Sequence, residues 1–398
     1  MKILYILHIT EMHGATISFL ALLKGMVGKG IKAVVIIPQK DVEFKKHLEK
    51  LGAKVYVVKS HSNTWQNVYN WHAIVKYPYL MTKQIVKYPY LMTKQYLIRK
   101  KQKQKIIKII KEEGIDLVHT NVGILYAGHY AAHKMGIPHV WHIREYGDLD
   151  FKMHMLPTKS SFRRKLKKDW VITITKDLLR YNELDNSEKA VAIYNGVRNR
   201  EDVQLEHVRD RCFLCASRVA ETKGHTLVID TFIRFCKIIP NFKLVILGDG
   251  EPEYIEMLKQ KVHDAGCDGK VEFVGHVDNV TDYMKKSRAL IVASFAEGFG
   301  RMTAEAAFAG CPVIGRNTGG TKEILEATGG FLFNDEEELL NSMIKMAKLP
   351  NEEYFSMIVK AQNIAKELYS EESYVEKVYD VYKKAMKYQG LNCDNLPN

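Results

Sequence analysis

Short apolar runs rich in β-branched residues alternate with longer amphipathic segments, and this alternation constrains the fold more than any other feature of the chain. In the first half, the runs predict strands at 3–7, 33–37, 54–58, 117–119, 139–142 and 190–194, and the amphipathic segments predict helices at 15–28, 42–51 and 125–135. Parallel strands need a long connection between them, usually a helix. The pattern therefore predicts parallel sheet with crossover helices.

The second half of the chain repeats this rhythm. It predicts strands at 211–217, 244–247, 271–274, 289–292 and 312–314, and helices at 226–236, 253–265 and 303–309. A chain of 398 residues is long enough for two domains of ordinary size. We therefore predict an α/β protein with two Rossmann-like, doubly wound domains. Turn residues at 195–197 place the junction, which gives domains at 1–195 and 196–372 and a C-terminal helix at 373–398.

Basic residues are concentrated in the first half. Residues 1–200 contain 35 Lys and Arg against 15 Asp and Glu, a net charge of +20, whereas residues 201–398 contain 24 against 31, a net charge of −7. A strongly basic domain typically meets polyanions, phosphorylated ligands or an anionic membrane surface. Because no aromatic–basic RNA motif or recognition helix accompanies the charge, we expect no nucleic-acid partner.

An eleven-residue segment at 74–84 (IVKYPYLMTKQ) recurs without change at 85–95. Two short copies are too few for a solenoid. Pro78 and Pro89 are predicted to interrupt any continuous helix through the repeat. The segment 74–111 carries many Lys and Arg and no acidic residue before Glu112. It is interpreted either as a tolerated duplication in a surface excursion or as an arm that binds an anionic lipid surface.

The cysteines and the hydropathy of the sequence indicate the cellular compartment in which the protein is expected. Cys212 and Cys215 form a Cys-x2-Cys inside an apolar run, and no second pair or nearby His cluster completes a zinc site, so both are predicted to be buried strand residues. Without a disulfide framework, a reducing compartment is expected. The chain has no apolar stretch of about 18 residues, and its first apolar run is too short for a signal peptide, so we expect a cytoplasmic protein, soluble or peripheral on a membrane.

The most informative motif is EGFGRMTAEA at 297–306, where a predicted strand runs through a glycine-rich turn into a helix that begins near Arg301. Unpaired backbone N–H groups and a positive helix dipole at such a place can hold a phosphate. Glu297 and Glu305 are not anion ligands, but their carboxylates suit the hydroxyl groups of sugars that flank a diphosphate. A chance Glu pair beside an ordinary turn is the alternative.

A second motif, SRVAETKG at 217–224, directly follows the first strand of the second domain. Arg218 and Lys223 can converge on the crevice at the carboxyl ends of the strands, where open α/β sheets bind ligands. Two cations there would neutralise a diphosphate leaving group. Solvated surface charges on a loop are the alternative. The Gly-Asp-Gly turn at 248–250 closes another strand and is a weak signal by itself.

These motifs together resemble the donor-binding domain of family 4 retaining glycosyltransferases, which have the GT-B fold of two Rossmann-like domains facing across a cleft. The resemblance rests on Glu-x7-Glu (297, 305), Arg-x4-Lys (218, 223), Gly-Asp-Gly (248–250) and Asn-Gly-Val (195–197), in the family's order. It is dense over 195–330 and weak over 1–190. It implies a donor domain at 196–372, an acceptor domain at 1–195, and a final helix that crosses back to the acceptor domain.

The resemblance also implies a role for each motif residue. Glu297 would be catalytic and, with Gly298 and Phe299, would hold the donor sugar; Glu305 would bind the ribose; Arg218, Lys223, Gly300, Arg301, Met302 and Thr303 would bind the diphosphate. In the acceptor domain, His142 would face the donor, with His119 as its rival, and His13 and Gly14 would form a loop between donor and acceptor. The family often has two glycines at that loop, where this chain has His13-Gly14. The sequence Asp148-Leu149-Asp150 imitates a metal motif of the other glycosyltransferase fold, and we predict a solvated loop there.

The leading hypothesis is therefore a retaining glycosyltransferase that uses a nucleotide-diphosphate sugar, with no cofactor and no metal. Its expected acceptor is a saccharide or lipid-linked molecule in bacterial cell-surface polysaccharide assembly, at the inner face of the membrane. One alternative is a nucleotide-sugar 2-epimerase of the same architecture, which needs no separate acceptor. The other is a basic scaffold or binding protein. The donor sugar, the acceptor and the oligomeric state are left open.

Overall fold

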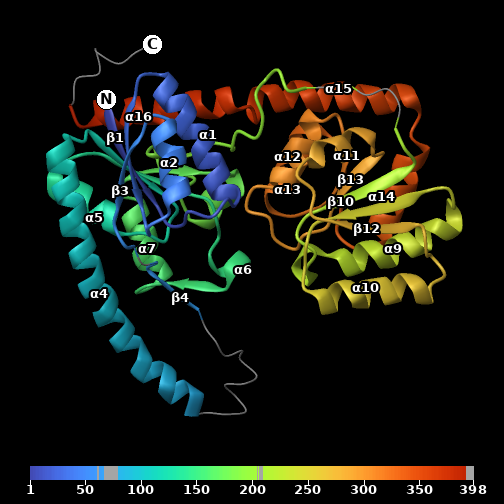
Figure 1. Cartoon of the computed structure of the whole chain (residues 1–398), viewed down its shortest axis with the longest axis horizontal. Helices are drawn as coiled ribbons and strands as arrows, with labels where there is room; N and C mark the ends of the chain where they lie inside the picture. The colour runs from blue at the N-terminus through green and yellow to red at the C-terminus, as the bar shows by residue number, and fades with distance from the viewer. Residues whose placement is uncertain (61, 67–78, 204, 206–208, 391–398) are drawn as a thin grey trace. The chain divides into compact units, whose positions relative to one another are not determined.

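The structure is a computed structural model that describes residues 1–60, 62–66, 79–203, 205 and 209–390. Its contacts divide the chain into two compact units. Unit 1 comprises Met1–Tyr194 together with Tyr374–Asn398, and unit 2 comprises Asn195–Ser373. Each unit is a parallel sheet covered by helices on both faces (Figure 1), so the predicted α/β class with two doubly wound sheets is confirmed.

Unit 1 is built on a seven-stranded sheet in the order β3-β2-β1-β5-β6-β8-β9, with every pairing parallel. Its strands are β1 (Lys2–Leu7), β2 (Lys32–Ile37), β3 (Lys54–Val57), β5 (Leu117–Asn121), β6 (His139–Ile143), β8 (Trp170–Thr173) and β9 (Ala190–Ala192). A small antiparallel pair joins β4 (Thr64–Gln66) to β7 (Met153–Met155). The helices are α1 (Gly14–Gly28), α2 (Val42–Lys50), α4 (Tyr79–Glu113), α5 (Ala127–Met135), α6 (Asp148–Phe151), α7 (Lys159–Leu166), α8 (Lys176–Tyr181) and α16 (Glu371–Tyr388).

Alternate side chains of β1 enter separate cores on the two faces of this sheet, because successive side chains of a strand point to opposite faces. Tyr5 packs in the core beneath α1 and α16, whereas Leu4 and Ile6 pack on the face covered by α4 and α5. Figure 1 shows α16 (red) beside α1 (blue). Helix α16 contributes Tyr374, Val375, Val378, Tyr379, Val381, Tyr382, Ala385 and Met386 to the first core. Gly25 allows α1 to approach it closely, since a Cβ there would lie 2.3 Å from Val375 Cγ2.

Unit 2 is built on a six-stranded parallel sheet in the order β12-β11-β10-β13-β14-β15. Its strands are β10 (Cys212–Ala216), β11 (Lys243–Leu247), β12 (Val271–Gly275), β13 (Ala289–Val292), β14 (Val313–Arg316) and β15 (Phe331–Phe333). Its helices are α9 (His225–Ile238), α10 (Pro252–Asp264), α11 (Val280–Lys286), α12 (Arg301–Phe308), α13 (Gly319–Thr328), α14 (Glu336–Lys348) and α15 (Asn351–Leu368), with a 3-10 turn, η1, at Glu221–Lys223.

Cys212 and Cys215 are buried, free strand residues of β10, as predicted. Cys215 packs in the core on one face of the sheet and Cys212 in the core on the other. Two thiols on opposite faces of a strand cannot ligate one ion, so the Cys-x2-Cys spacing carries no metal chemistry.

The prediction that Pro89 interrupts a helix is wrong. Helix α4 runs without a break from Tyr79 to Glu113 and includes Pro89, while Pro78 lies outside the described residues. A proline inside a helix removes one hydrogen bond and costs about 3 kcal/mol. The C-terminal half of α4 offsets this cost by packing: Ile106, Ile109 and Ile110 belong to a core of unit 1.

Candidate functional site

The glycine-rich motif forms the loop between β13 and α12 in unit 2. Gly300 precedes the helix with φ +82°, a backbone conformation that only glycine adopts without strain. No side chain caps the N-terminus of α12 in the described part of the chain. The first N–H groups of α12 and its dipole are thus available to an anion.

Two further glycines fix the position of this loop. Gly320, in the first turn of α13, donates its N–H to Glu297 O at 2.8 Å. A Cβ on Gly320 would lie 1.9 Å from Phe299 O, and one on Gly319 would lie 2.3 Å from Glu297 O. Only glycines allow α13 to come this close, and the contact holds the backbone of Glu297 and Phe299 in place.

Lys223 and Glu297 form an ion pair with Nζ and Oε1 2.6 Å apart, and both side chains are largely shielded from solvent. Lys223 ends the turn η1, and Gly224 follows it with φ +75°. A Cβ on Gly224 would lie 2.4 Å from Ala293 O, so the loop after β10 is packed against the loop after β13. Adjacent parallel strands thus bring a cation and a carboxylate from distant parts of the sequence to one sheet edge.

Both partners of this pair line a cavity of 210 Å³ at the carboxyl ends of β10 and β13. The cavity wall also includes Arg218, Gly300, Arg301, Met302 and Thr303. The structure therefore brings together every residue predicted to bind the diphosphate, along with Glu297. A space lined by cations, a helix N-terminus and one carboxylate suits a phosphorylated ligand that also carries hydroxyl groups.

Arg218 borders this cavity and a second one of 450 Å³. Its side chain is 71% exposed and forms an ion pair with Glu251, 3.2 Å from Nη2 to Oε1. The Gly-Asp-Gly turn forms one wall of the second cavity. This turn packs directly on the segment that carries Arg218, since a Cβ on Gly248 would lie 2.1 Å from Ser217 O. Ala216, Ser217, Arg218 and Met302 line both cavities, so the two cavities adjoin one another.

Glu305 lies one turn into α12 and lines neither cavity. Its Oε1 is 2.8 Å from Arg301 Nε, and its side chain is only 12% exposed. Binding of the ribose by Glu305 stays a prediction. It would require the ion pair between Glu305 and Arg301 to separate. Phe299 is buried against Tyr369, with ring centroids 6.3 Å apart, and Gly298 lies between Glu297 and Phe299 in the loop.

His142, the candidate from unit 1, ends a row of buried aromatic side chains. Its Nδ1 lies 3.3 Å from His119 Nε2, and His119 Nδ1 lies 2.6 Å from Tyr382 Oη. Burial, with a smaller contribution from Arg144, holds the pKa of His142 well below its usual range, so the ring is neutral. His142 Nε2 is buried with no hydrogen-bond partner among the described residues. A neutral imidazole with one unbonded nitrogen is suited to donate to or accept from a ligand hydroxyl.

The loop residues His13 and Gly14 are exposed at the N-terminus of α1. A Cβ on Gly14 would meet nothing within 4 Å, so this glycine serves no close backbone contact within the chain. Their role toward donor and acceptor stays a prediction.

Sequence reasoning assigned no role to two ionisable residues that follow β6, the buried Arg144 and the partly buried Glu145. Arg144 donates from Nε to Asn121 Oδ1 and from Nη2 to Tyr374 Oη, each at 2.8 Å. Burial raises the pKa of Glu145 to about 7. An Arg-Glu pair directly after the strand that carries His139 and His142 was the signal available in the sequence.

The prediction of a solvated loop at Asp148-Leu149-Asp150 is wrong, because these residues form the single-turn helix α6. Asp148 Oδ2 pairs with Lys159 Nζ at 3.1 Å, whereas Asp150 accepts hydrogen bonds from the N–H groups of Tyr146 and Gly147. The two carboxylates thus bind separate donors inside unit 1.

Comparison with known families matches almost the whole chain in two parts. Residues 12–200 match Glycosyltransferase Family 4, and residues 197–363 match Glycosyl transferases group 1. The chain is 30% identical over 257 residues to an uncharacterized glycosyltransferase of Methanocaldococcus jannaschii, covering 62% of this chain and 68% of that protein. It is 26% identical over 241 residues to alpha-monoglucosyldiacylglycerol synthase of Acholeplasma laidlawii, covering 58% and 57%.

Solved structures share the fold over nearly the full length of the chain. HepE from Anabaena in complex with UDP superposes with a TM-score of 0.75 at 19% identity, over 96% of this chain and 100% of that one. TarM from S. aureus, in a complex that includes UDP, superposes with a TM-score of 0.68 at 12% identity, over 96% and 99%.

Proposed function

Since the chain belongs to glycosyltransferase family 4, we propose that it transfers a sugar, with retention of anomeric configuration, from a uridine-diphosphate sugar to a saccharide or lipid-linked acceptor. One observation carries the proposal: Lys223, Glu297 and the uncapped N-terminus of α12 line a single cavity. The choice of uridine is supported by the structures of HepE, which hold UDP or UDP-glucose.

The reaction needs two charges to be stabilised in its transition state. Negative charge develops on the departing diphosphate, and Lys223, Arg218 and the first N–H groups of α12 supply positive charge and hydrogen-bond donors for it. Positive charge develops on the sugar, and the Glu297 carboxylate is the anionic group of the same cavity. A bound diphosphate would compete for Lys223 and release the Glu297 carboxylate toward the sugar.

Metal independence is part of this proposal. Two side-chain cations and a helix N-terminus at one cavity supply what a divalent ion supplies to a diphosphate elsewhere. Turnover should therefore persist in EDTA at a temperature well below the melting point. The 2-epimerase alternative is not favoured, because both matched families are described as glycosyltransferases.

Nucleotide binding provides the direct test of the donor proposal. UDP at about 100 times its Kd should stabilise the protein by about 2.7 kcal/mol, since a ligand that binds only the folded state adds RT ln(1 + [L]/Kd). We expect UDP to raise the melting temperature more than GDP or ADP at equal concentration, and we expect Lys223→Ala to reduce the UDP shift. If no nucleoside diphosphate changes the melting temperature, the cavity is not a donor site.

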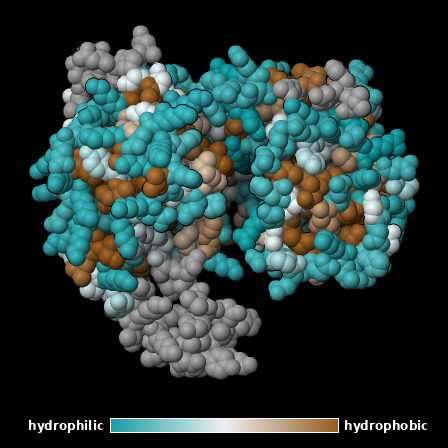
Figure 2. Space-filling view, in the orientation of Figure 1, coloured by the Kyte–Doolittle hydropathy of each residue, from teal (hydrophilic) through white to brown (hydrophobic). Residues whose placement is uncertain are grey.

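We also propose that an anionic membrane surface is a partner of unit 1. Residues 76–111 contain 11 Lys and Arg, and Tyr96 and Leu97 of α4 are exposed between them. On the coloured part of unit 1 that Figure 2 shows, hydrophobic residues lie in patches among hydrophilic ones. Since basic residues predominate in the segment, electrostatic attraction rather than deep insertion is the expected mode. Among the described helices, none is both long and apolar enough to cross a bilayer.

Vesicle binding tests this partner. The protein should co-sediment with vesicles that contain acidic lipid and should detach as salt rises, since each basic residue near such a surface contributes about 1 kcal/mol, screened within about 10 Å at 0.1 M salt. Deleting residues 85–95 removes about three helical turns and nearly preserves the phase of α4, so binding should weaken only partly while UDP binding is unchanged. Equal binding to neutral and acidic vesicles would identify the repeat as a tolerated duplication.

A further inference from the structure

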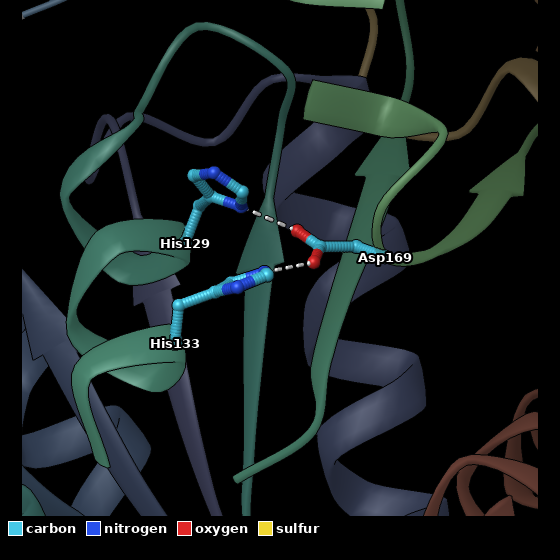
Figure 3. A group of neighbouring side chains, drawn as sticks. All are labelled: His129, His133 and Asp169. Carbon is cyan, nitrogen blue, oxygen red and sulfur yellow. Dashed lines mark hydrogen bonds and ion pairs between the residues drawn. The ribbon is translucent and has the colours of Figure 1, made fainter. Parts of the chain in front are cut away.

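A cluster of three histidines and one aspartate lies in unit 1 at the amino ends of β6 and β8, and the proposed transfer reaction does not use it. Asp169 directly precedes β8, and its side chain is 3% exposed. His129 and His133 are four residues apart on α5, so both rings lie on one face of that helix. Figure 3 shows both rings directed at the Asp169 carboxylate.

The ligand atoms of this cluster converge. His129 Nδ1 lies 2.6 Å from Asp169 Oδ2, and His133 Nε2 lies 2.6 Å from Oδ1. These nitrogen and oxygen atoms all lie within 4.8 Å of one another, and among the described residues this is the one such group of three. From these contacts we propose that His129, His133 and Asp169 bind a divalent transition metal ion of the zinc class, which ties α5 to the edge of the sheet.

The donor set and its spacing suit this ion. Zinc prefers imidazole and carboxylate donors at about 2.0–2.2 Å in tetrahedral geometry, which puts ligand atoms roughly 3.3 Å apart. The present N···O separations of 2.6 Å are those of hydrogen bonds, and each pair would widen by roughly 0.7 Å when an ion takes the place of the shared proton. The two nitrogens now bond different oxygens of Asp169, so both rings would also turn toward one point. Small side-chain rotations on a helix and a strand end supply such a shift.

A supporting shell around the carboxylate is already present. His139 Nδ1 lies 2.7 Å from Asp169 Oδ2, and His139 Nε2 lies 2.8 Å from Thr120 Oγ1. Ligating groups in metal sites are oriented by such outer hydrogen bonds. The side chain of His133 is 46% exposed, so it offers an entry path and leaves room for a water molecule as fourth ligand.

The ion would act on stability rather than on sugar transfer. The cluster lies at the amino ends of its strands, whereas open α/β sheets bind their ligands at the carboxyl ends. Binding to the folded state alone raises stability by mass action. The inference is therefore independent of the donor proposal, and each can fail without the other.

Metal titration of the whole protein tests the site. Wild-type protein, first treated with a chelator, should bind one Zn²⁺ per chain in calorimetry, and the ion should raise its melting temperature. His133→Ala removes the most exposed ligand and should weaken zinc binding at least tenfold, while UDP binding is unchanged. His263→Ala is the matched control, because His263 is an exposed histidine 3.1 Å from Asp268 in unit 2, and it should bind zinc like wild type.

Cobalt provides a readout that does not depend on a variant folding. Co²⁺ added to the wild-type protein should give the visible absorption bands of a four-coordinate nitrogen and oxygen site, and Zn²⁺ should abolish them. The proposal is overturned if wild-type protein shows no saturable binding of one ion, or if His133→Ala binds zinc as tightly as wild type. Either result would leave the cluster as a hydrogen-bonded network around a buried carboxylate.

Discussion

Lys223→Ala should lower the turnover number for sugar transfer about a hundredfold at saturating donor. Removing one group that stabilises developing negative charge typically costs a factor of 10²–10³, and a hundredfold loss corresponds to about 2.7 kcal/mol of transition-state stabilisation. Lys223 is positioned for this role by the left-handed Gly224 and by its place in the wall of the cavity. Steady-state kinetics with the preferred donor measure the effect.

A matched control is available in the same unit. Lys322 forms an exposed pair with Glu326 at 3.7 Å, four residues apart on α13. Such exposed pairs contribute little to stability, so Lys322→Ala should retain wild-type activity. If Lys223→Ala also kept near wild-type turnover at saturating donor, the assignment of Lys223 to the leaving group would be wrong.

Glu297→Gln should lower the turnover number by a similar factor, because it removes the negative charge that stabilises the cationic sugar. The amide keeps the size of the side chain and can still accept a hydrogen bond from Lys223, but it carries no charge to stabilise a cationic sugar. Because this stabilisation exists only in the transition state, the turnover number should fall while the KM for the donor changes little.

The double variant adds a sharper measurement. Lys223 and Glu297 touch in the present structure, so their effects should not be additive, and the double variant should lose less activity than the product of the two single losses. Glu326→Gln is the control for the charge change. Strict additivity would show that the two side chains act independently of each other.

The strands could be predicted because they are short apolar runs bounded by turn residues. For β10, β11, β12 and β13, the pattern placed the strands within a residue or so of their observed ends. Helix α4 was misjudged because a single proline was given more weight than the long run of helix-forming residues around it and the packing of Ile106, Ile109 and Ile110.

The sequence predicted which residues line the site but not which of their side chains contact each other. Strand order alone indicates that the loops after β10 and β13 meet at one sheet edge, because these strands are neighbours. The contact of Lys223 with Glu297 and that of Arg218 with Glu251 depend on side-chain torsions that no spacing encodes. Likewise, His129 and His133 show a recognisable spacing, but Asp169 joins them only through the fold.

Because α16 packs in unit 1, unit 1 can complete its folding only after unit 2 has been synthesised. Tyr374, Val378 and Tyr382 fill the core that also holds Tyr5 and Phe19, so this core cannot close until residues about 370 positions further along the chain have been synthesised. Unit 2 is contiguous in sequence and can complete its sheet while unit 1 still exposes apolar surface. During that interval the apolar surface of unit 1 is open to aggregation. A chain truncated before Tyr374 would have the whole sequence of unit 2 but an open core in unit 1.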